Sequence, residues 1–131
     1  MKTLQIMLLT GLAAFAVACG GYGSHSTTPP TPGTVPNVTA LVPNNANAGS
    51  TKVVLTVNGT SFNSTATINW KGAAITTTYV SGNQLMAAIP DADLATSGTA
   101  AVTVTNPGTG MGLYGGGTSA ETSNSMTFTI N

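Results

Sequence analysis

The chain of 131 residues is almost uncharged: it has three lysines, no arginine and three acidic side chains, and its formal net charge at pH 7 is zero. Only 5% of the residues are charged, whereas an average soluble domain has roughly 25%, so the polar surface must consist mainly of hydroxyl and amide groups. This composition excludes the clusters of basic residues that bind nucleic acids, and the length suits a single domain.

Residues 1–18 have the pattern of a secretory signal peptide. Lys2 precedes an apolar run from Ile6 to Val17, and small residues end the run before Cys19. The run is shorter than the about 20 apolar residues that a transmembrane helix needs, so the pattern favours an export signal over a membrane span. We therefore expect the protein to be exported.

Cys19, the only cysteine of the chain, comes directly after this leader. The run Val17-Ala18-Cys19-Gly20 resembles a bacterial lipobox, in which the cysteine receives a lipid and becomes the new N-terminus. The resemblance implies an anchor at the cell surface, in the bacterial outer membrane, because each buried CH₂ of an acyl chain contributes about 0.8 kcal/mol. Ala16-Val17-Ala18 also fits ordinary signal peptidase, and that alternative gives a secreted, soluble protein with a free thiol.

Residues 19–36 are rich in Gly, Ser and Pro and contain almost nothing to bury. This composition predicts a disordered tether between the lipidated Cys19 and a folded domain. The Pro-rich second half of the tether is expected to be extended, at about 3.1 Å per residue. His25, the only histidine, lies among serines in this segment and is expected to be solvated.

Residues 37–131 alternate apolar and polar side chains in the way that is typical of strands with one buried face. Turn residues separate these runs, and Asn58-Gly59 is expected to supply positive φ at one turn, after which Phe62 returns to the core. Asp91 is expected to cap a short helical turn. The expected strands are 37–43, 52–57, 66–70, 75–80, 84–89, 100–105 and 126–130. Seven short strands at this spacing predict a β-sandwich.

Several short motifs follow one another in this region. They are Val57-Asn58-Gly59 with Phe62 three residues later, Ile68-Asn69-Trp70-Lys71-Gly72, Ala88-Ile89-Pro90, and the run from Val102 to Gly108. Their order and spacing resemble the IPT/TIG domain over residues 37–131. The resemblance implies an all-β, immunoglobulin-like β-sandwich of about seven strands. It also implies recognition of proteins or polysaccharides, because similar domains accompany cell-surface receptors and carbohydrate-active proteins.

The folded region offers little chemistry for catalysis. It contains no histidine, cysteine or arginine and has three acidic residues, so neither a nucleophile beside a base nor a well-formed carboxylate site is indicated. We therefore expect no enzyme, no cofactor and no metal site. Trp70 is in strand phase with Ile68 and is expected in the core; the alternative is an exposed ring that stacks on sugars.

The loop from Gly108 to Asn124 is longer than in the family that the motifs resemble, and strand packing does not explain its apolar residues. Met111, Leu113 and Tyr114 are therefore a candidate binding loop, and the alternative is that the loop folds back over one edge of a sheet. Two functions stay open. One is a non-catalytic cell-surface module that binds protein or polysaccharide. The other is a structural subunit that self-associates through exposed strand edges into a filament or envelope layer, since few charges protect those edges.

Overall fold

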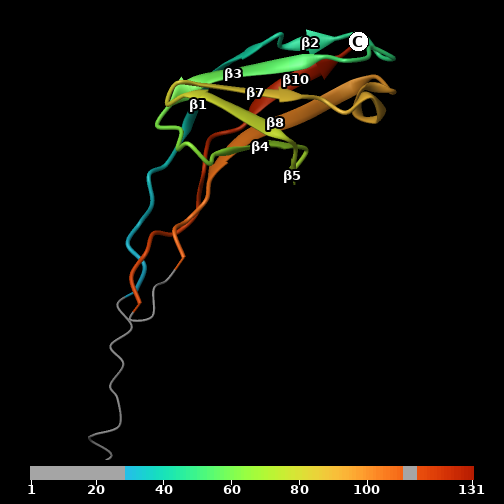
Figure 1. The fold of residues 1–131 in the computed structure, drawn as a ribbon. Helices are drawn as coiled ribbons and strands as arrows, with labels where there is room; N and C mark the ends of the chain where they lie inside the picture. Colours follow the sequence, from blue (N-terminus) through green and yellow to red (C-terminus); the bar gives the residue numbers. More distant parts are fainter. Residues whose placement is uncertain (1–28, 111–114) are drawn as a thin grey trace, which may run out of the picture.

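The protein is an immunoglobulin-like sandwich of two β-sheets. The computed structural model describes residues 29–110 and 115–131. Figure 1 shows the strands stacked in two layers, and a narrow stalk, formed by residues 29–36, 107–110 and 115–120, leaves one end. The strands are β1 (Asn37–Val42), β2 (Asn45–Ala46), β3 (Val54–Thr60), β4 (Thr67–Trp70), β5 (Ala73–Ala74), β6 (Thr77–Ser81), β7 (Gln84–Ala88), β8 (Gly98–Asn106), β9 (Glu121–Thr122) and β10 (Met126–Ile130). A short 3-10 helix, η1 (Asp91–Leu94), connects β7 to β8.

The first sheet has the strand order β1-β3-β7-β6, and the second has the order β2-β10-β8-β4-β5, with β9 also paired to β8. All pairs are antiparallel except β2 with β10. The predicted all-β sandwich is confirmed. The described chain has more strands than the seven predicted because β2, β5 and β9 are two residues long, too short for alternation to be visible in a sequence.

The core lies between the two sheets and is centred on an aromatic pair. Trp70 and Phe128 meet edge to face, with ring centroids 5.1 Å apart and an interplanar angle of 61°. Such a pair contributes about 0.5–1.5 kcal/mol beyond its buried area. Trp70 is 2% exposed, so its predicted place in the core is confirmed and sugar stacking by this ring is ruled out. Around the pair lie Val38, Leu41, Leu55, Val57, Phe62, Ile68, Leu85, Ile89, Leu94, Val102, Val104 and Ile130.

The turn after β3 differs from the prediction. β3 continues through Asn58 and Gly59, and the positive φ falls on Ser61, at 62°. Gly59 is needed for another reason: a Cβ there would overlap the carbonyl oxygen of Asn37 on β1 and the ring of Phe62. Glycine at this position therefore permits close packing of β1 and Phe62 rather than an unusual backbone conformation.

The predicted helical turn is present as η1, but the prediction that Asp91 caps it is wrong. Pro90 occupies the cap position and the cap has no side-chain hydrogen bond. The Asp91 carboxylate instead accepts a hydrogen bond from the backbone N–H of Lys52, with 2.8 Å between Oδ1 and N. Because that contact and a positive φ hold Lys52 outside the strand, β3 begins at Val54 and not at Lys52.

Candidate binding surface

The side of the β1-β3-β7-β6 sheet that faces away from the core carries exposed apolar side chains. The strand register places Val42, Thr56 and Met86 side by side, with Thr78 of β6 next to Met86. Val42 is 55% exposed and Met86 is 37% exposed. Val54, at 48% exposure, pairs with Ala88 beside this row. We call the surface formed by Val42, Val54, Thr56, Thr78, Met86 and Ala88 the outer face.

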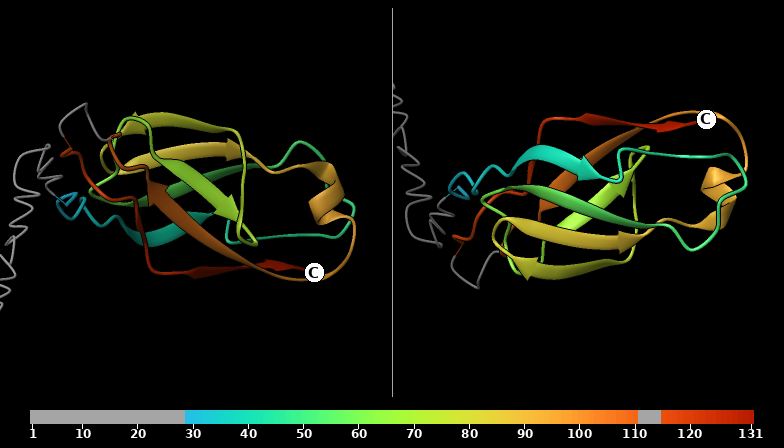
Figure 2. Two further views of the ribbon diagram at one scale, coloured as in Figure 1. Left: turned by 90° about the horizontal axis from the view of Figure 1, so that it is seen from below. Right: turned by 90° about the horizontal axis from the view of Figure 1, so that it is seen from above.

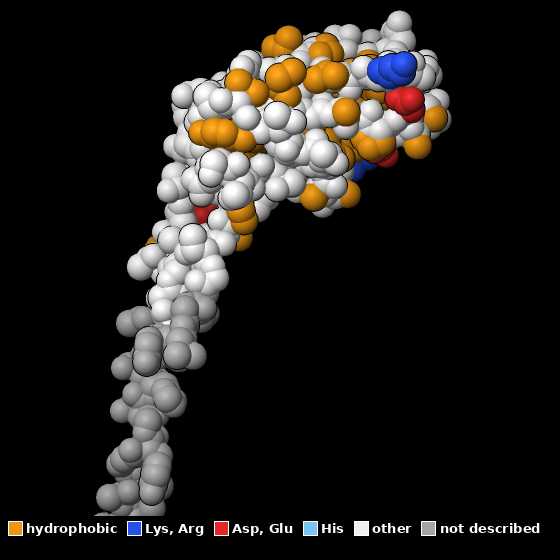
Figure 3. Space-filling view, in the orientation of Figure 1, with side chains coloured by type: hydrophobic (Ala, Val, Ile, Leu, Met, Phe, Trp, Pro, Cys, Tyr) orange, Lys and Arg blue, Asp and Glu red, His pale blue; other side chains and the backbone are white. Residues whose placement is uncertain are grey.

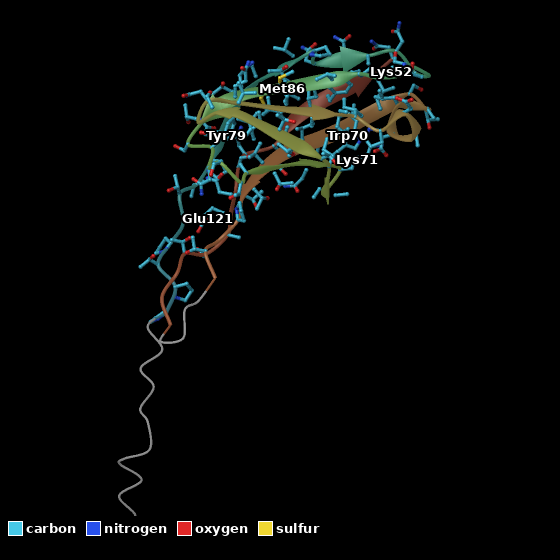
Figure 4. The ribbon with its side chains drawn as sticks, in the orientation of Figure 1. Lys52, Trp70, Lys71, Tyr79, Met86 and Glu121 are labelled. Carbon is cyan, nitrogen blue, oxygen red and sulfur yellow. The ribbon has the colours of Figure 1, made fainter. Side chains whose placement is uncertain are left out.

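The outer face is hollowed around the side chain of Met86. Val54, Thr78, Met86 and Ala88, with Ala87 between them, line an open depression of about 290 Å³. Figure 3 shows apolar side chains over this part of the molecule, and the charged side chains visible there lie at the two ends of the sandwich. Figure 4 marks Met86 among the strands of this sheet. The depression is thus shallow, largely apolar and built from uncharged residues.

A pair of amide side chains bounds the outer face at the end where β3 runs toward the stalk. The Gln84 side chain donates a hydrogen bond from Nε2 to Oδ1 of Asn58, at 3.2 Å. Asn58 and Gln84 are paired in the register, two residues along each strand from the pair of Thr56 and Met86. The outer face therefore changes from apolar to polar across two neighbouring rows of the sheet.

The second sheet presents a different outer surface, which consists mainly of hydroxyl and amide groups. Asn69 of β4 donates hydrogen bonds from Nδ2 to Thr103 Oγ1 at 3.3 Å and to Thr105 Oγ1 at 2.8 Å. Thr127 of β10 is exposed, opposite Ala101. Because the second sheet presents mainly polar side chains and the outer face has apolar groups in contact with water, the outer face is the better candidate for a partner.

The edge strand β6 is a second surface open to other chains. β6 lies at the end of its sheet and pairs with β7 alone, and it carries neither a charged residue nor a proline. Tyr79 is 41% exposed and Val80 is 47% exposed. A bulge between Tyr79 and Ser81 interrupts the pairing with β7. Charges and prolines are among the main devices that protect sheet edges, and at β6 only the bulge serves this purpose.

The candidate binding loop and the lipidation site lie outside the described residues. These are Met111, Leu113 and Tyr114 of the loop, and Cys19 after the leader. The parts of the long loop that the structure describes run beyond the end of the sandwich, beside the segment that precedes β1 (Figure 1). There the backbone N–H of Thr31 donates to the carbonyl of Gly117, and the N–H of Ser119 donates to the carbonyl of Thr31, both at 3.0 Å.

A buried asparagine joins this stalk to the sandwich. Asn106, at the end of β8, is 1% exposed. Its Nδ2 donates to the carbonyl oxygens of Thr34 at 2.7 Å and Ser61 at 2.8 Å, and its Oδ1 accepts from the backbone N–H of Asn63 at 3.0 Å. In the sequence, Asn106 belongs to the motif from Val102 to Gly108, which assigns it no role. A buried, fully bonded asparagine has the same local sequence signature as an exposed turn asparagine, so no signal was available.

Charged groups are dispersed across the domain. Lys52 and Glu121 lie at opposite ends of it (Figure 4). Across residues 29–110 and 115–131, no three side chains among His, Cys, Asp and Glu are grouped so that they could hold a metal ion. In the same described ranges, no helix has the length and apolar character to span a membrane.

The fold and the outer face define an immunoglobulin-like binding or structural module. The family model described as IPT/TIG domain matches residues 36–130, and the chain belongs to this family. The family predicted from the motifs around Trp70 and Asn106 is thereby confirmed. No curated protein matches the chain.

A similar solved structure is called "Putative phosphatase from Bacteroides thetaiotaomicron VPI-5482". It is 19% identical, with a TM-score of 0.46, and the match covers 74% of this chain and 18% of that one. This chain therefore spans less than a fifth of the length of that protein, and the likeness carries no argument about function here.

Proposed function

We propose that this protein is an exported, non-catalytic lipoprotein whose IPT/TIG domain binds another protein at the cell surface through the outer face. The observation that carries the proposal is the exposed, uncharged surface around Met86 and Val54, set against the polar outer surface of the other sheet. Apolar patches of this kind on a soluble domain mark interaction sites. Burial of the patch contributes about 25 cal/mol per Å² of apolar area.

The chemistry of the outer face indicates which partner suits it. Its side chains are aliphatic or thioether groups, and methionine adapts its shape to different partners. Because no charge is available on the outer face for recognition, the complementary surface is an uncharged, apolar patch of a protein. A polysaccharide is recognised better by exposed aromatic rings. Trp70 is buried. The exposed Tyr79 pairs with Leu85 and not with Met86, so its ring lies off the outer face. Protein recognition is therefore the function that the surface supports best.

The membrane part of the proposal rests on the leader and on Cys19. Acylation of Cys19 would anchor the chain in the bacterial outer membrane, and ordinary cleavage after Ala18 would release a soluble protein. Mass spectrometry of the protein made by an exporting bacterium distinguishes these two products, because acyl chains add a defined mass to the N-terminal peptide. The expected product begins at an acylated Cys19, and Cys19→Ser is expected to abolish acylation. A product with an unmodified Cys19 at its N-terminus contradicts the anchor.

The binding function is tested by capture from envelope extract with the chain from Gly20 to Asn131. Met86→Asp and Val54→Asp each place a charge on the outer face, and Thr127→Asp places the same charge on the other sheet as a matched control. We expect the wild type and the control to capture the same protein, both outer-face variants to lose it, and the purified partner to bind directly and saturably. Capture that the outer-face variants retain contradicts the proposed surface.

The same experiment tests the loop predicted from the sequence. The triple variant Met111→Ser, Leu113→Ser and Tyr114→Ser keeps every contact that the structure describes in the stalk. Loss of capture in this variant alone would place the binding site on the loop. A polysaccharide, and not a protein, bound by the wild type would contradict the choice of partner and leave the binding module in place.

The second candidate function is self-assembly into a filament or envelope layer, favoured by the uncharged edge of β6. Sedimentation velocity of the chain from Gly20 to Asn131 over a wide concentration range tests it. If the edge pairs between chains, wild-type oligomers grow with concentration and Val80→Lys restores the monomer, because a charge on an edge strand blocks pairing. A wild type that stays monomeric throughout contradicts this candidate.

A further inference from the structure

The segment before β1 and the described parts of the long loop run side by side and form the stalk (Figures 1 and 2). We call residues 107–110 and 115–120 the collar. Two backbone hydrogen bonds connect Thr31 to the collar, at 3.0 Å each, and Thr31 forms an isolated parallel bridge with Thr118. The two halves of the collar are joined to each other as well: the N–H of Thr118 donates to Thr109 Oγ1 at 2.8 Å, and the N–H of Thr109 donates to Thr118 Oγ1 at 3.1 Å.

Contacts continue from Thr31 toward the sandwich. The N–H of Gly33 lies 3.3 Å from both Ser119 Oγ and Glu121 Oε1, and Ser119 Oγ donates to that carboxylate at 2.7 Å. Asn106 binds the carbonyl of Thr34, as described above. The segment before β1 is therefore bonded, at successive positions along its length, to the last residue of β8 and to the chain that follows it.

The last of these bonds lies at the start of β1. The Asn124 side chain accepts from the N–H of Val38 at 2.8 Å and donates to its carbonyl at 2.9 Å, in the manner of a neighbouring strand. Pro36, just before β1, is fully buried. The segment that enters the sandwich is thus fixed from Thr31 to Val38.

Glycines stand where the two parts of the stalk approach most closely. A Cβ at Gly33 would overlap the carbonyl oxygen of Ser119, and a Cβ at Gly108 would overlap that of Thr118. At Gly110, two residues further along the same loop, a Cβ would meet open space. Close backbone approach is a reason for glycine that differs from chain flexibility, so the composition that reads as a flexible linker also permits an ordered contact.

We propose that the collar is an intramolecular clamp that holds the tether against the domain from Thr31 onward and so fixes which end of the sandwich lies closest to the anchor. The membrane consequence rests on the proposed acylation of Cys19. Twelve residue steps separate Cys19 from Thr31, which span at most about 40 Å, whereas a tether free as far as Pro36 would span up to about 60 Å. The clamp thus replaces the last part of the tether, from Thr31 to Pro36, with a fixed stalk.

The clamp also restricts which surfaces of the sandwich face away from the membrane. The stalk leaves one end of the sandwich, and the C-terminus lies toward the other end (Figures 1 and 2). The collar end is therefore held toward the membrane, while the outer face, on the flank of the domain, is presented sideways. A partner at the outer face would approach along the cell surface, and proteins carried by the same membrane suit this geometry.

Hydrogen exchange on the chain from Gly20 to Asn131 tests the clamp without any lipid. We expect the amides of Thr31 and Ser119 to be protected in the wild type and to exchange at least tenfold faster in Gly33→Ala and Gly108→Ala. Gly110→Ala is the matched control and is expected to leave their exchange unchanged. The amide of Leu55 in β3 stays protected in all three variants if the sandwich is folded. Wild-type exchange of Thr31 at the rate of an unstructured peptide overturns the proposal, as does unchanged exchange in Gly33→Ala.

The orientation is tested on the acylated protein in lipid vesicles. A fluorophore on a cysteine introduced at Ala48, near the C-terminal end of the sandwich, reports its distance from an acceptor in the bilayer by energy transfer. We expect a distance distribution that becomes broader in Gly33→Ala and not in Gly110→Ala. Equal distributions in these two variants overturn the orienting role. If mass spectrometry finds no acyl group on Cys19, the anchor fails, and the exchange experiment still decides whether the clamp exists.

Discussion

Asn106 is expected to contribute more to stability than the other polar side chains of the domain, because its three hydrogen bonds join the end of β8 to the segment before β1 and to the turn after β3. Asn106→Ala removes three hydrogen bonds, each worth about 1 kcal/mol net, and leaves buried partners that cost about 1–3 kcal/mol each where water cannot replace the bond. The partners, at Thr34, Ser61 and Asn63, are part-buried, so partial hydration lowers the total to ~3 kcal/mol. This loss lowers the Tm by roughly 15 °C in a domain of this size.

Urea denaturation of the chain from Gly20 to Asn131, followed by tryptophan fluorescence of Trp70, measures this loss. Asn124→Ala is the matched control, because it removes two hydrogen bonds from a more exposed site, with an expected cost of about 1 kcal/mol. A loss below 1 kcal/mol for Asn106→Ala, or equal losses in the two variants, would refute the role assigned to Asn106.

Asn106→Asp adds a test of the bond directions. The introduced carboxyl keeps an acceptor for the N–H of Asn63 but turns an oxygen toward the carbonyls of Thr34 and Ser61. Repulsion and burial disfavour its ionised form and raise its pKa in the folded state above the unfolded value of about 3.9. The folded state then binds the proton more tightly, so stability relative to wild type is greatest below pH ~4 and falls as the pH rises through the raised pKa. A difference from wild type that is constant between pH 3.5 and pH 7 contradicts these bond directions.

Three further predictions concern packing. Gly59→Ala places a methyl group against the Asn37 carbonyl and the Phe62 ring and is expected to lower the free energy of unfolding by about 1–3 kcal/mol. Gly110→Ala, the control, stays within about 0.5 kcal/mol of wild type. Equal losses in urea titrations would contradict the packing role of Gly59. Nε1 of Trp70 is buried without a hydrogen-bond partner in the described part of the chain. Trp70→Phe, which removes this N–H, is therefore expected to cost less than about 2 kcal/mol and Trp70→Ala about 3–5 kcal/mol, and similar costs by thermal unfolding would disagree. Met86→Asp is expected to lower the unfolding free energy by about 1 kcal/mol, because the side chain is 37% exposed and Asp is disfavoured in strands; a loss above about 2 kcal/mol would mean that Met86 supports the fold.

Local alternation was sufficient to predict the longer strands and the sandwich. Trp70 is buried where the strand pattern placed it, because a period of two determines which face of a strand is apolar. Asn58-Gly59 predicts a turn because the dipeptide is common in turns. The other use of glycine, to let a neighbouring strand approach, is visible only once β1 is in place.

The candidate surfaces depend on contacts between distant parts of the chain. Val54 and Met86 are each readable as outward-facing residues, but only the register of β3 and β7 makes them one surface. The clamp was beyond prediction for a related reason. The bonds between Thr31 and the collar are made mainly by backbone groups, and backbone hydrogen bonds require none of the apolar residues whose absence predicted a disordered tether.

The most direct test of the account is the dissociation constant of the captured partner, measured with purified proteins by calorimetry for wild type, Met86→Asp and Thr127→Asp. The account predicts that Met86→Asp weakens binding at least tenfold, which corresponds to about 1.4 kcal/mol, while Thr127→Asp stays within about twofold of wild type. Equal affinity of wild type and Met86→Asp would contradict the claim that the outer face is the binding surface of this domain.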